Sequence, residues 1–182
     1  KTALFNALTG GHQKVANYAG VTVERKEGRV RSASGRSITA LDLPGTYSLR
    51  ARSPDEEVTR DAVLGRLAGE PVPDVIVAVA DATNLRLALR LALELKAVGR
   101  PMVLALNMFD IAERQGLRID LERLSADLGV PVIPTTATRR RGIDDLVQAI
   151  EAAAASAATT ETARTTPDAA ALRVKASEAE RI

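Results

Sequence analysis

The sequence has no cysteine, no tryptophan and a single histidine, with only two tyrosines and two phenylalanines among its 182 residues. Without thiolates it cannot form a cysteine-based zinc site or an iron–sulfur site, and His12 alone cannot form a transition-metal centre. We therefore expect any bound metal to be a hard cation with oxygen ligands, such as Mg²⁺, rather than iron. Leu, Val, Ile and Ala must build the core.

A strong charge imbalance and a long apolar run are also absent. The 25 Lys and Arg residues against 23 Asp and Glu residues leave a formal charge of +2, which gives no reason to expect a nucleic acid partner. The basic residues 139–141 are interpreted as a solvated loop. No apolar stretch approaches the ~20 residues that a membrane helix needs. If the parent protein spans a membrane, we expect the spanning part downstream of residue 182.

Apolar periodicity predicts strands that alternate with helices. Residues 27–33 and 36–42 alternate in polarity around a Ser-Gly turn, which predicts a hairpin. Ser53 and Pro54 have the chemistry of a helix start, and this helix is expected to run to about Gly69. The remaining predictions are strands near 75–80, 102–106 and 130–134, and helices near 2–8, 84–98, 120–128 and 142–155. This alternation predicts an α/β fold with a doubly wound sheet and a ligand at the carboxyl edge of its strands.

The helix at 84–98 has a narrow polar stripe formed by Arg86, Arg90 and Glu94 at i, i+4 spacing. Its other faces are apolar. We therefore expect this helix to be buried over most of its girth.

The most informative segment is Asn107-Met108-Phe109-Asp110, which follows the apolar run at residues 103–106. An Asp carboxylate at a strand end can accept two parallel hydrogen bonds from the N1–H and 2-amino groups of guanine. Adenine lacks that pair of donors, so Asp110 would also discriminate between the bases. The Asn107 amide can join the base-binding loop to a phosphate-binding loop.

The amino-terminal Lys1-Thr2 corresponds to the last two residues of the phosphate-loop motif G-x-x-x-x-G-K-[ST]. In that motif the lysine reaches the β- and γ-phosphates and the hydroxyl coordinates Mg²⁺. The helix that follows adds unpaired N–H groups directed at the anion. We expect the glycines of the loop, and the strand before them, to lie upstream of Lys1.

Three further segments complete a nucleotide site in sequence order. The strand ending at Asp42 continues to Gly45, in a D-x-x-G pattern that suits water-mediated Mg²⁺ binding and a backbone contact to the γ-phosphate. Thr22 lies in a connection where a switch loop would bring a hydroxyl to the metal. The loop at Thr136-Ala137 can offer backbone N–H groups to the guanine carbonyl.

With these residues in view, the chain resembles the cytosolic GTP-binding domain of FeoB-type ferrous iron transporters. The resemblance covers roughly residues 1–150 and includes stretches peculiar to that family. They are Leu8-Thr9-Gly10, Gln13-Lys14-Val15, Gly20-Val21-Thr22-Val23-Glu24, Asp42-Leu43-Pro44-Gly45-Thr46-Tyr47-Ser48-Leu49, Ala80-Asp81-Ala82-Thr83-Asn84-Leu85, Ala105-Leu106-Asn107-Met108 and Gly142-Ile143-Asp144-Asp145-Leu146.

The resemblance implies a P-loop NTPase of the Ras-like G-domain type, with a mostly parallel sheet flanked by helices. It implies that GTP or GDP binds with Mg²⁺, and that residues 17–24 and 42–50 change conformation between the two states. The implied roles are phosphate and metal ligands at Lys1 and Thr2, metal contacts at Thr22 and Asp42, a γ-phosphate sensor at Gly45, base readers at Asn107 and Asp110, and a loop under the guanine at Thr136 and Ala137.

The chain departs from the usual pattern at three positions. Tyr18-Ala19 replaces the Trp-Pro of the first switch, which removes a fixed φ angle. Met108 stands where most small G proteins have lysine, and its aliphatic length can cover one face of the base. Thr46 replaces the water-orienting glutamine of Ras-like proteins, so slow hydrolysis is expected. Potassium use stays open, because the family asparagine that helps hold K⁺ would lie upstream of Lys1.

Residues 1–155 are expected to form the GTP-binding domain, and residues 156–182 a linker and the start of a helical domain, with Asp168 capping a helix through residue 181. The implied protein is the cytoplasmic GTPase domain of an inner-membrane iron transporter, in contact with downstream helical and transmembrane domains. Its oligomeric state, a homo-oligomer included, stays open. A soluble ribosome-assembly or tRNA-modification GTPase is the first alternative, and a nucleotide-binding module without enzymatic activity is the second.

Overall fold

The computed structural model describes residues 1–165, and its centre is a parallel sheet with the strand order β4–β5–β6. Strand β5 (Met102–Asn107) pairs with β4 (Ile76–Asp81) on one side and with β6 (Val132–Pro134) on the other. Every residue of β5 is buried, as a strand covered on both faces requires. The strands end at a shared carboxyl edge, where Asp81 lies opposite Asn107.

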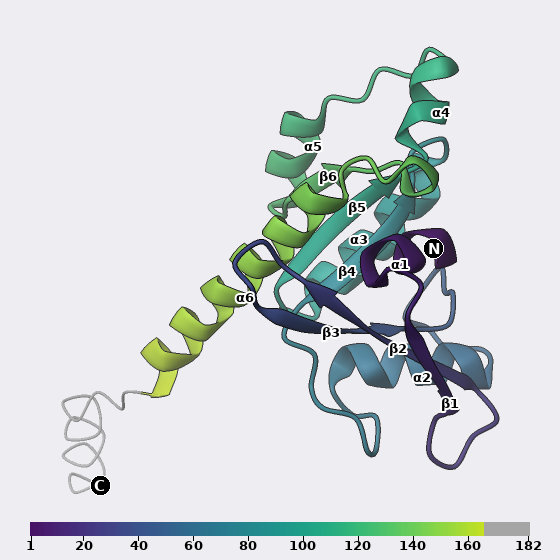
Figure 1. Ribbon diagram of the computed structural model, residues 1–182, viewed down its shortest axis with the longest axis vertical. Helices are drawn as coiled ribbons and strands as arrows, with labels where there is room; N and C mark the ends of the chain where they lie inside the picture. Colours follow the sequence, from purple (N-terminus) through teal and green to yellow (C-terminus); the bar gives the residue numbers. More distant parts are fainter. Residues whose placement is uncertain (166–182) are drawn as a thin grey trace, which may run out of the picture.

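A second, antiparallel sheet contains β1 (Gln13–Asn17), β2 (Glu24–Arg31) and β3 (Ser37–Asp42) in that order. The β2–β3 hairpin confirms the prediction, whereas β1 was not expected. All five residues of β1 are exposed, so the strand has no buried face and its sequence has no apolar alternation. Among the described residues no hydrogen-bonded strand pair joins the two sheets, which lie next to each other in Figure 1.

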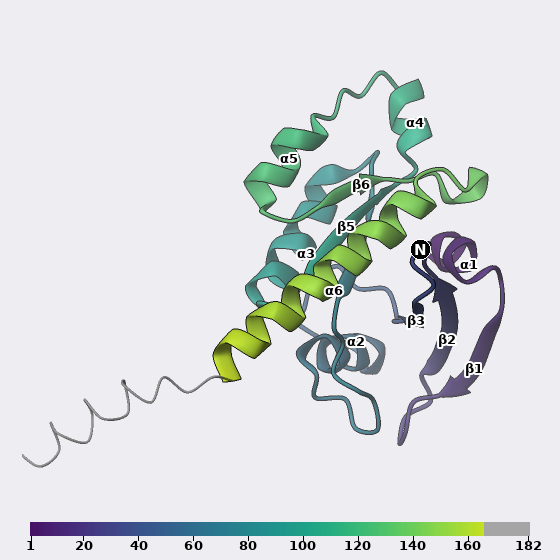
Figure 2. The same cartoon turned by 60° about the vertical axis from the view of Figure 1, so that its left-hand side comes forward.

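Helices cover both faces of the parallel sheet (Figures 1 and 2). The helical elements, in chain order, are α1 (Thr2–Thr9), α2 (Pro54–Leu64), α3 (Leu85–Ala97), α4 (Phe109–Arg114), α5 (Leu121–Leu128), the 3₁₀ turn η1 (Ala137–Arg139) and α6 (Ile143–Thr165). The alternation of strand and helix confirms the α/β class.

The core is divided by β5, whose side chains alternate between two apolar clusters. Val103 and Ala105 pack with Leu4 of α1 and Leu146 of α6. Leu104 and its neighbours on the opposite face pack with residues of α3 and α5. Aliphatic side chains and alanines dominate both clusters, as the shortage of aromatic residues predicts.

Helix α2 begins as predicted and ends earlier. Ser53 Oγ accepts a hydrogen bond from the Glu56 backbone N–H at 3.3 Å, and Pro54 occupies the first helical position. The helix ends at Leu64, not near Gly69, because Gly65 adopts a left-handed conformation with φ of 70°. The expectation of a helix to Gly69 is therefore wrong.

Three other elements also differ from the predictions. Helix α3 was expected to be buried over most of its girth and is not, because Leu87 is 40% and Leu93 is 55% exposed. The helix lies against one face of the sheet, so its outer side remains open to solvent. Helix α4 was not predicted, because its six residues are too few for an apolar period to be recognised. Strand β6 is shorter than the run at 130–134.

Helix α6 continues to Thr165, through residues that were expected to be a linker. Residues 156–165 contain no glycine or proline, and they continue the alanine-rich run at residues 152–158, which favours helix even without an apolar stripe. The predicted helix from Asp168 to residue 181 lies outside the described residues. Within residues 1–165, no helix combines the length and the apolar character needed to cross a membrane.

Candidate functional site

Asn107 lies at the end of β5 and joins the ends of the three parallel strands. Its side chain Oδ1 accepts hydrogen bonds from the Ala137 backbone N–H at 3.1 Å and from Thr135 Oγ1 at 3.3 Å. Its backbone carbonyl accepts from the N–H of Ala82, which follows β4, at 2.9 Å. Asn107 is buried, so these bonds fix the loop after β6 against the end of β5. The Ala137 N–H, predicted to face a guanine carbonyl, here bonds to Asn107.

Asp110 lies in the first turn of α4, three residues after Asn107. Its side chain is 13% exposed, and its Oδ2 accepts a hydrogen bond from Arg114 Nη2 at 3.1 Å. Arg139 Nη1, which comes from the loop after β6, lies 3.9 Å from the same oxygen. Sequence reasoning missed both arginines. The i, i+4 spacing of Asp110 and Arg114 was the available signal for the first.

Met108 turns the chain between the two polar residues. Its φ of 61° is left-handed, which is uncommon for a residue with a side chain and occurs at functional sites. Its carbonyl accepts hydrogen bonds from the N–H groups of Ile111 and Ala112 at 3.0 and 3.2 Å, so it starts α4. The Met108 side chain is 37% exposed beside Asp110, where an apolar surface can face a planar base.

The loop after β6 is closed by a pair of backbone hydrogen bonds between Thr136 and Arg141, at 3.0 and 3.2 Å. Thr136 and Ala137 are buried. Gly142 follows with φ of 72°, and a Cβ at this position would lie 2.1 Å from the carbonyl oxygen of Pro134. The absence of a side chain at Gly142 thus permits this close approach to Pro134, and Arg139 of the same loop lies beside Asp110.

A second group of predicted residues meets where β3 ends. Lys1 Nζ lies 2.7 Å from Asp42 Oδ1 and also donates to the carbonyl oxygen of Leu43. The Asp42 side chain is 11% exposed, and Lys1 immediately precedes α1. Two residues 41 positions apart, predicted to serve the same triphosphate, are therefore in contact. Thr2 is exposed in the first turn of α1.

The loop after Asp42 is held by side chains that sequence reasoning did not assign. Thr59 of α2 donates from Oγ1 to the Pro44 carbonyl at 3.0 Å. Glu94 of α3 accepts hydrogen bonds from Ser48 and Leu49. Gly45 lies between these two attachments and is exposed, while the Thr46 hydroxyl donates to the Ser48 carbonyl at 2.6 Å.

Thr22 lies in the turn between β1 and β2, where Asn17 pairs with Glu24. Its side chain is exposed, and within residues 1–165 no hydrogen bond joins it to Lys1, Thr2 or Asp42. The structure therefore joins Lys1 with Asp42, and Asn107 with Ala137, but does not place Thr22 in contact with either pair.

Tyr18, at the start of the same turn, is 2% exposed and packs with Val23 and Val58. Among the described residues its hydroxyl has no hydrogen-bond partner. Burial raises the pKa of Tyr18 to about 12, and the nearby Glu70 carboxylate adds to the rise. The residue in place of the family tryptophan thus anchors one end of the turn in an apolar cluster.

The donors near Lys1 have the chemistry that Mg²⁺ requires. The carboxylate of Asp42 and the hydroxyl of Thr2 are hard oxygen ligands. Mg²⁺ commonly binds one or two carboxylates together with substrate phosphates and water. Within residues 1–165, no cluster of three or more His, Asp or Glu side chains forms a metal site. A magnesium site here would therefore depend on the nucleotide for part of its ligands.

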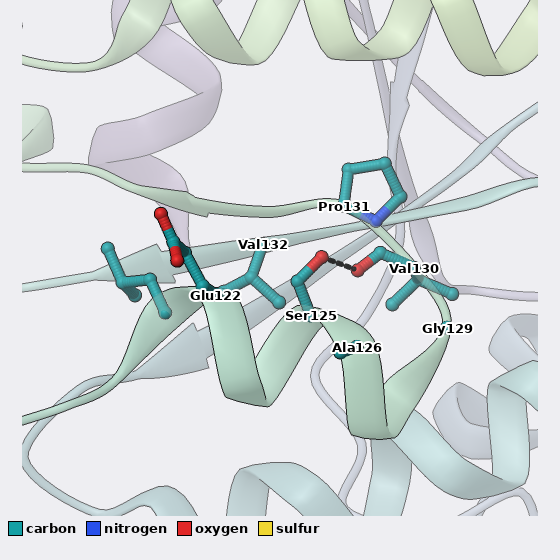
Figure 3. A pocket seen from close by; sticks show the side chains of 8 residues that line it. Glu122, Ser125, Ala126, Gly129, Val130, Pro131 and Val132 are labelled. Atoms are coloured by element: carbon teal, nitrogen blue, oxygen red, sulfur yellow. Dashed lines mark hydrogen bonds between the residues drawn. The ribbon is translucent and has the colours of Figure 1, made fainter.

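A surface hollow occurs elsewhere, between α5 and β6 (Figure 3). The Ser125 hydroxyl spans part of it by donating to the Val130 carbonyl at 2.8 Å. None of the predicted site residues lines this hollow. It is therefore separate from the strand-end site.

Comparisons with known proteins identify the family of the chain. The family described as ferrous iron transport protein B matches residues 1–150. The Fe(2+) transporter FeoB of Escherichia coli strain K12 is 49% identical over 155 residues, which cover 83% of this chain and 19% of the relative. The FeoB of Salmonella typhimurium strain LT2 is 48% identical with the same coverage. The chain thus spans about a fifth of the length of these curated relatives.

Solved structures of the same kind are similar throughout the described fold. The cytosolic domain of T. maritima FeoB in its GMPPNP form is 41% identical, with a TM-score of 0.77 over 84% of this chain and 58% of that chain. Its GDP form I is 42% identical, with a TM-score of 0.78 over 85% and 58%. The isolated G domain of that protein has a TM-score of 0.74 at 41% identity, over 85% and 91%. The chain therefore belongs to the ferrous iron transport protein B family and has the P-loop NTPase fold of its G domain.

Proposed function

We propose that this chain is a guanine-nucleotide switch that hydrolyses GTP slowly and regulates a ferrous iron transporter. The observation that carries the proposal is the arrangement at the strand ends. Asn107 and Asp110 lie beside the loop of Ala137, and Lys1 meets Asp42. The similar cytosolic structures named for GMPPNP and GDP support the same ligand class.

The base is read by Asp110, whose two carboxylate oxygens match the N1–H and 2-amino donors of guanine. Arg114 orients this carboxylate from one helical turn away. Met108 covers one face of the base, and Asn107 keeps the Thr136-Ala137 loop in place beneath it. Guanine recognition thus relies on a buried amide and on a carboxylate held by an arginine.

The phosphates are bound by Lys1, whose ammonium group leaves Asp42 when the anion enters. Asp42, through a water molecule, and the hydroxyls of Thr2 and Thr22 would hold a divalent ion that binds with the nucleotide, and Gly45 would offer its backbone N–H to the γ-phosphate. Such an ion would supply positive charge to the phosphate oxygens. Phosphate-loop glycines upstream of Lys1 complete the site in this proposal.

Hydrolysis is slow because Thr46 is too short to orient water as glutamine does in Ras-like proteins. The Thr46 hydroxyl is also occupied by the Ser48 carbonyl. We assign no catalytic base to the chain. Thr22, Gly45 and Thr46 are the residues expected to respond to the γ-phosphate.

Switching in this proposal involves residues 17–24 and 42–50. These segments order around a triphosphate and relax after hydrolysis. The change passes to helical and transmembrane domains beyond this chain, and the nucleotide-binding domain lies on the cytoplasmic side of the inner membrane.

The test is phosphate release from GTP by the full-length protein, compared with its Asp42→Ala variant. We expect at least a tenfold loss of rate, because the variant lacks the carboxylate that positions the metal. Asp127→Ala is the matched control, since that carboxylate is 72% exposed and lies on α5. Equal rates above background in all three proteins would remove Asp42 from the hydrolytic site, and a rate no higher than that of GTP alone in the unmodified protein would favour the non-enzymatic nucleotide-binding module. The family match removes the reason to prefer a soluble ribosome-assembly or tRNA-modification GTPase.

A further inference from the structure

Glu94 of α3 attaches the segment that follows Gly45 to the body of the domain. Its Oε2 accepts hydrogen bonds from Ser48 Oγ at 2.9 Å and from the Leu49 backbone N–H at 2.6 Å. Its Oε1 lies 3.2 Å from the same serine hydroxyl. One carboxylate therefore binds two consecutive residues that are 46 and 45 positions away in the sequence.

The attachment continues within the loop itself. Ser48 Oγ also accepts the Arg50 backbone N–H at 3.1 Å, and Thr46 Oγ1 accepts the Ser48 backbone N–H at 3.2 Å. The Leu49 side chain packs against the apolar cluster around β5. The chain at residues 48–50 is thus fixed through its side chains and its backbone.

A second attachment lies on the other side of Gly45. Thr59 of α2 is buried and donates to the Pro44 carbonyl at 3.0 Å. Between the two attachments, Gly45 is exposed and an added Cβ would meet no atom within 4 Å. Tyr47 is 69% exposed. The part of the loop that is free to move is therefore short, from Gly45 to Tyr47.

Ionisation favours the attachment at Glu94. The Leu49 N–H, followed by the Ser48 hydroxyl and the charges of Arg90 and Arg50, holds the pKa of the Glu94 carboxyl below its ordinary value. Hydrogen bonds to an ionised acceptor are stronger than those between neutral groups. Arg90 itself lies 3.7 Å from Glu94 and its side chain is 67% exposed, so the ion pair alone contributes little.

We propose that Glu94 is a positioning residue for the contact between Gly45 and the γ-phosphate. It acts by fixing Ser48 and Leu49, so that within the switch segment 42–50 the residues left for the triphosphate to order are mainly 45–47. Each additional residue that must be ordered costs conformational entropy and so weakens triphosphate binding. The inference rests on the proposed GTP site and adds a residue of α3 that shapes its selectivity for the triphosphate.

The test measures the affinities of the full-length protein for GMPPNP and for GDP with Mg²⁺ present. In Glu94→Ala we expect GMPPNP to bind about tenfold more weakly and GDP to change by less than about twofold, because GDP has no γ-phosphate for Gly45 to contact. Glu94→Gln should recover most of the loss, since its amide oxygen can still accept the Leu49 N–H.

Two further variants make the result specific. Ser48→Ala removes the hydroxyl and leaves the Leu49 N–H bound, so we expect a smaller shift of the affinity ratio in the same direction. Glu122→Ala, on the exposed side of α5, should leave both affinities unchanged. Ser48→Ala also keeps the test decisive if Glu94→Ala fails to fold.

The outcomes separate the inference from the proposed function. Failure of the unmodified protein to bind either nucleotide would overturn the proposed function. Normal binding by the unmodified protein, with an unchanged GMPPNP-to-GDP ratio in Glu94→Ala and Ser48→Ala, would overturn the role of Glu94 and leave the GTP site intact. An equal loss of both nucleotides would reduce Glu94 to general structural support and would also overturn the inference.

Discussion

At the scale of single residues, Asp110 is the position where one atom changes specificity. Replacing it by asparagine substitutes a donor for one of the two acceptors that face guanine. We expect Asp110→Asn to lose about 10- to 100-fold in GTP affinity, the range for one well-formed bidentate contact. Xanthosine triphosphate should gain affinity, because its 2-oxo group accepts from the new amide.

Competition binding with GTP, ATP and xanthosine triphosphate on the full-length protein measures this change. Asp127→Asn is the control, because the side chain of Asp127 is 72% exposed and lies on α5, outside the loop at Thr136-Ala137 that we call the base loop. Unchanged discrimination between GTP and ATP in Asp110→Asn would remove Asp110 from the role of base reader.

Tyr18 supports a prediction about stability at alkaline pH. Its folded-state pKa is about 12, above the ordinary 10.0, so the unfolded chain releases the proton first as pH rises. The stability contributed by the neutral phenol is therefore present below about pH 10 and is lost between pH 10 and 12. In Tyr18→Phe this loss, on the order of 2 kcal/mol, should disappear.

Urea unfolding at a series of pH values tests the point for Tyr18→Phe and for Tyr47→Phe, whose ring is 69% exposed. Below pH 10, Tyr18→Phe should be at least as stable as the unmodified protein, because it removes a buried hydroxyl without a partner. Parallel pH profiles for all three proteins would contradict the buried state of Tyr18.

At the scale of elements, the exposed turn between β1 and β2 allows the binding role of Thr22 to be separated from any effect on stability. Its hydroxyl is exposed, so Thr22→Ala should change the free energy of unfolding by less than about 0.5 kcal/mol. Triphosphate binding with Mg²⁺ should nevertheless weaken, with diphosphate binding nearly intact, if the turn moves to the metal. Calorimetric titration with GMPPNP and GDP distinguishes this from an equal loss of both, which would exclude the switch role.

The elements also show what a sequence can and cannot predict. The buried run of β5 and the N-terminal cap of α2 were recognised from local pattern, because their causes lie within a few residues. Strand β1 was missed because it has no buried face. The end of α6 was missed because an alanine-rich stretch has helix propensity without a period.

The same rule applies to the site predictions. Asn107 and Asp110 were predicted to read the base because a short motif carries their chemistry. Thr59 and Glu94 bind the loop after Asp42 from helices that lie 15 and 45 residues further along the chain. No local sequence pattern predicts such a pairing. Whether Thr22 lies near Asp42 depends on the conformation of a turn, which local pattern does not determine.

At the scale of the whole molecule, the site depends on contacts between distant parts of the chain. Lys1 joins α1 to the end of β3. The tip of the β2–β3 hairpin contacts α6 through Ser34, whose hydroxyl donates to Glu151 at 2.6 Å. Helix α6 in turn packs on β5 and begins directly after the base loop (Figure 2). The base loop and the antiparallel sheet are therefore both attached to one helix.

Gly142 is the residue at which this arrangement is most sensitive, because it connects the base loop to α6. A Cβ there would lie 2.1 Å from the Pro134 carbonyl oxygen, and φ is 72°. We expect Gly142→Ala to lower the free energy of unfolding by about 3 kcal/mol or more, since the backbone has to shift to accept the added Cβ.

Gly116→Ala is the matched control, with φ of 75° and no atom within 4 Å of the added Cβ. It should lose only about 1 kcal/mol, from the left-handed backbone alone. Chemical unfolding gives both values, and the difference isolates the collision between β6 and the start of α6. Similar losses in the two variants would mean that the base loop can yield without disturbing β6, and guanine nucleotide binding by Gly142→Ala would then remain normal.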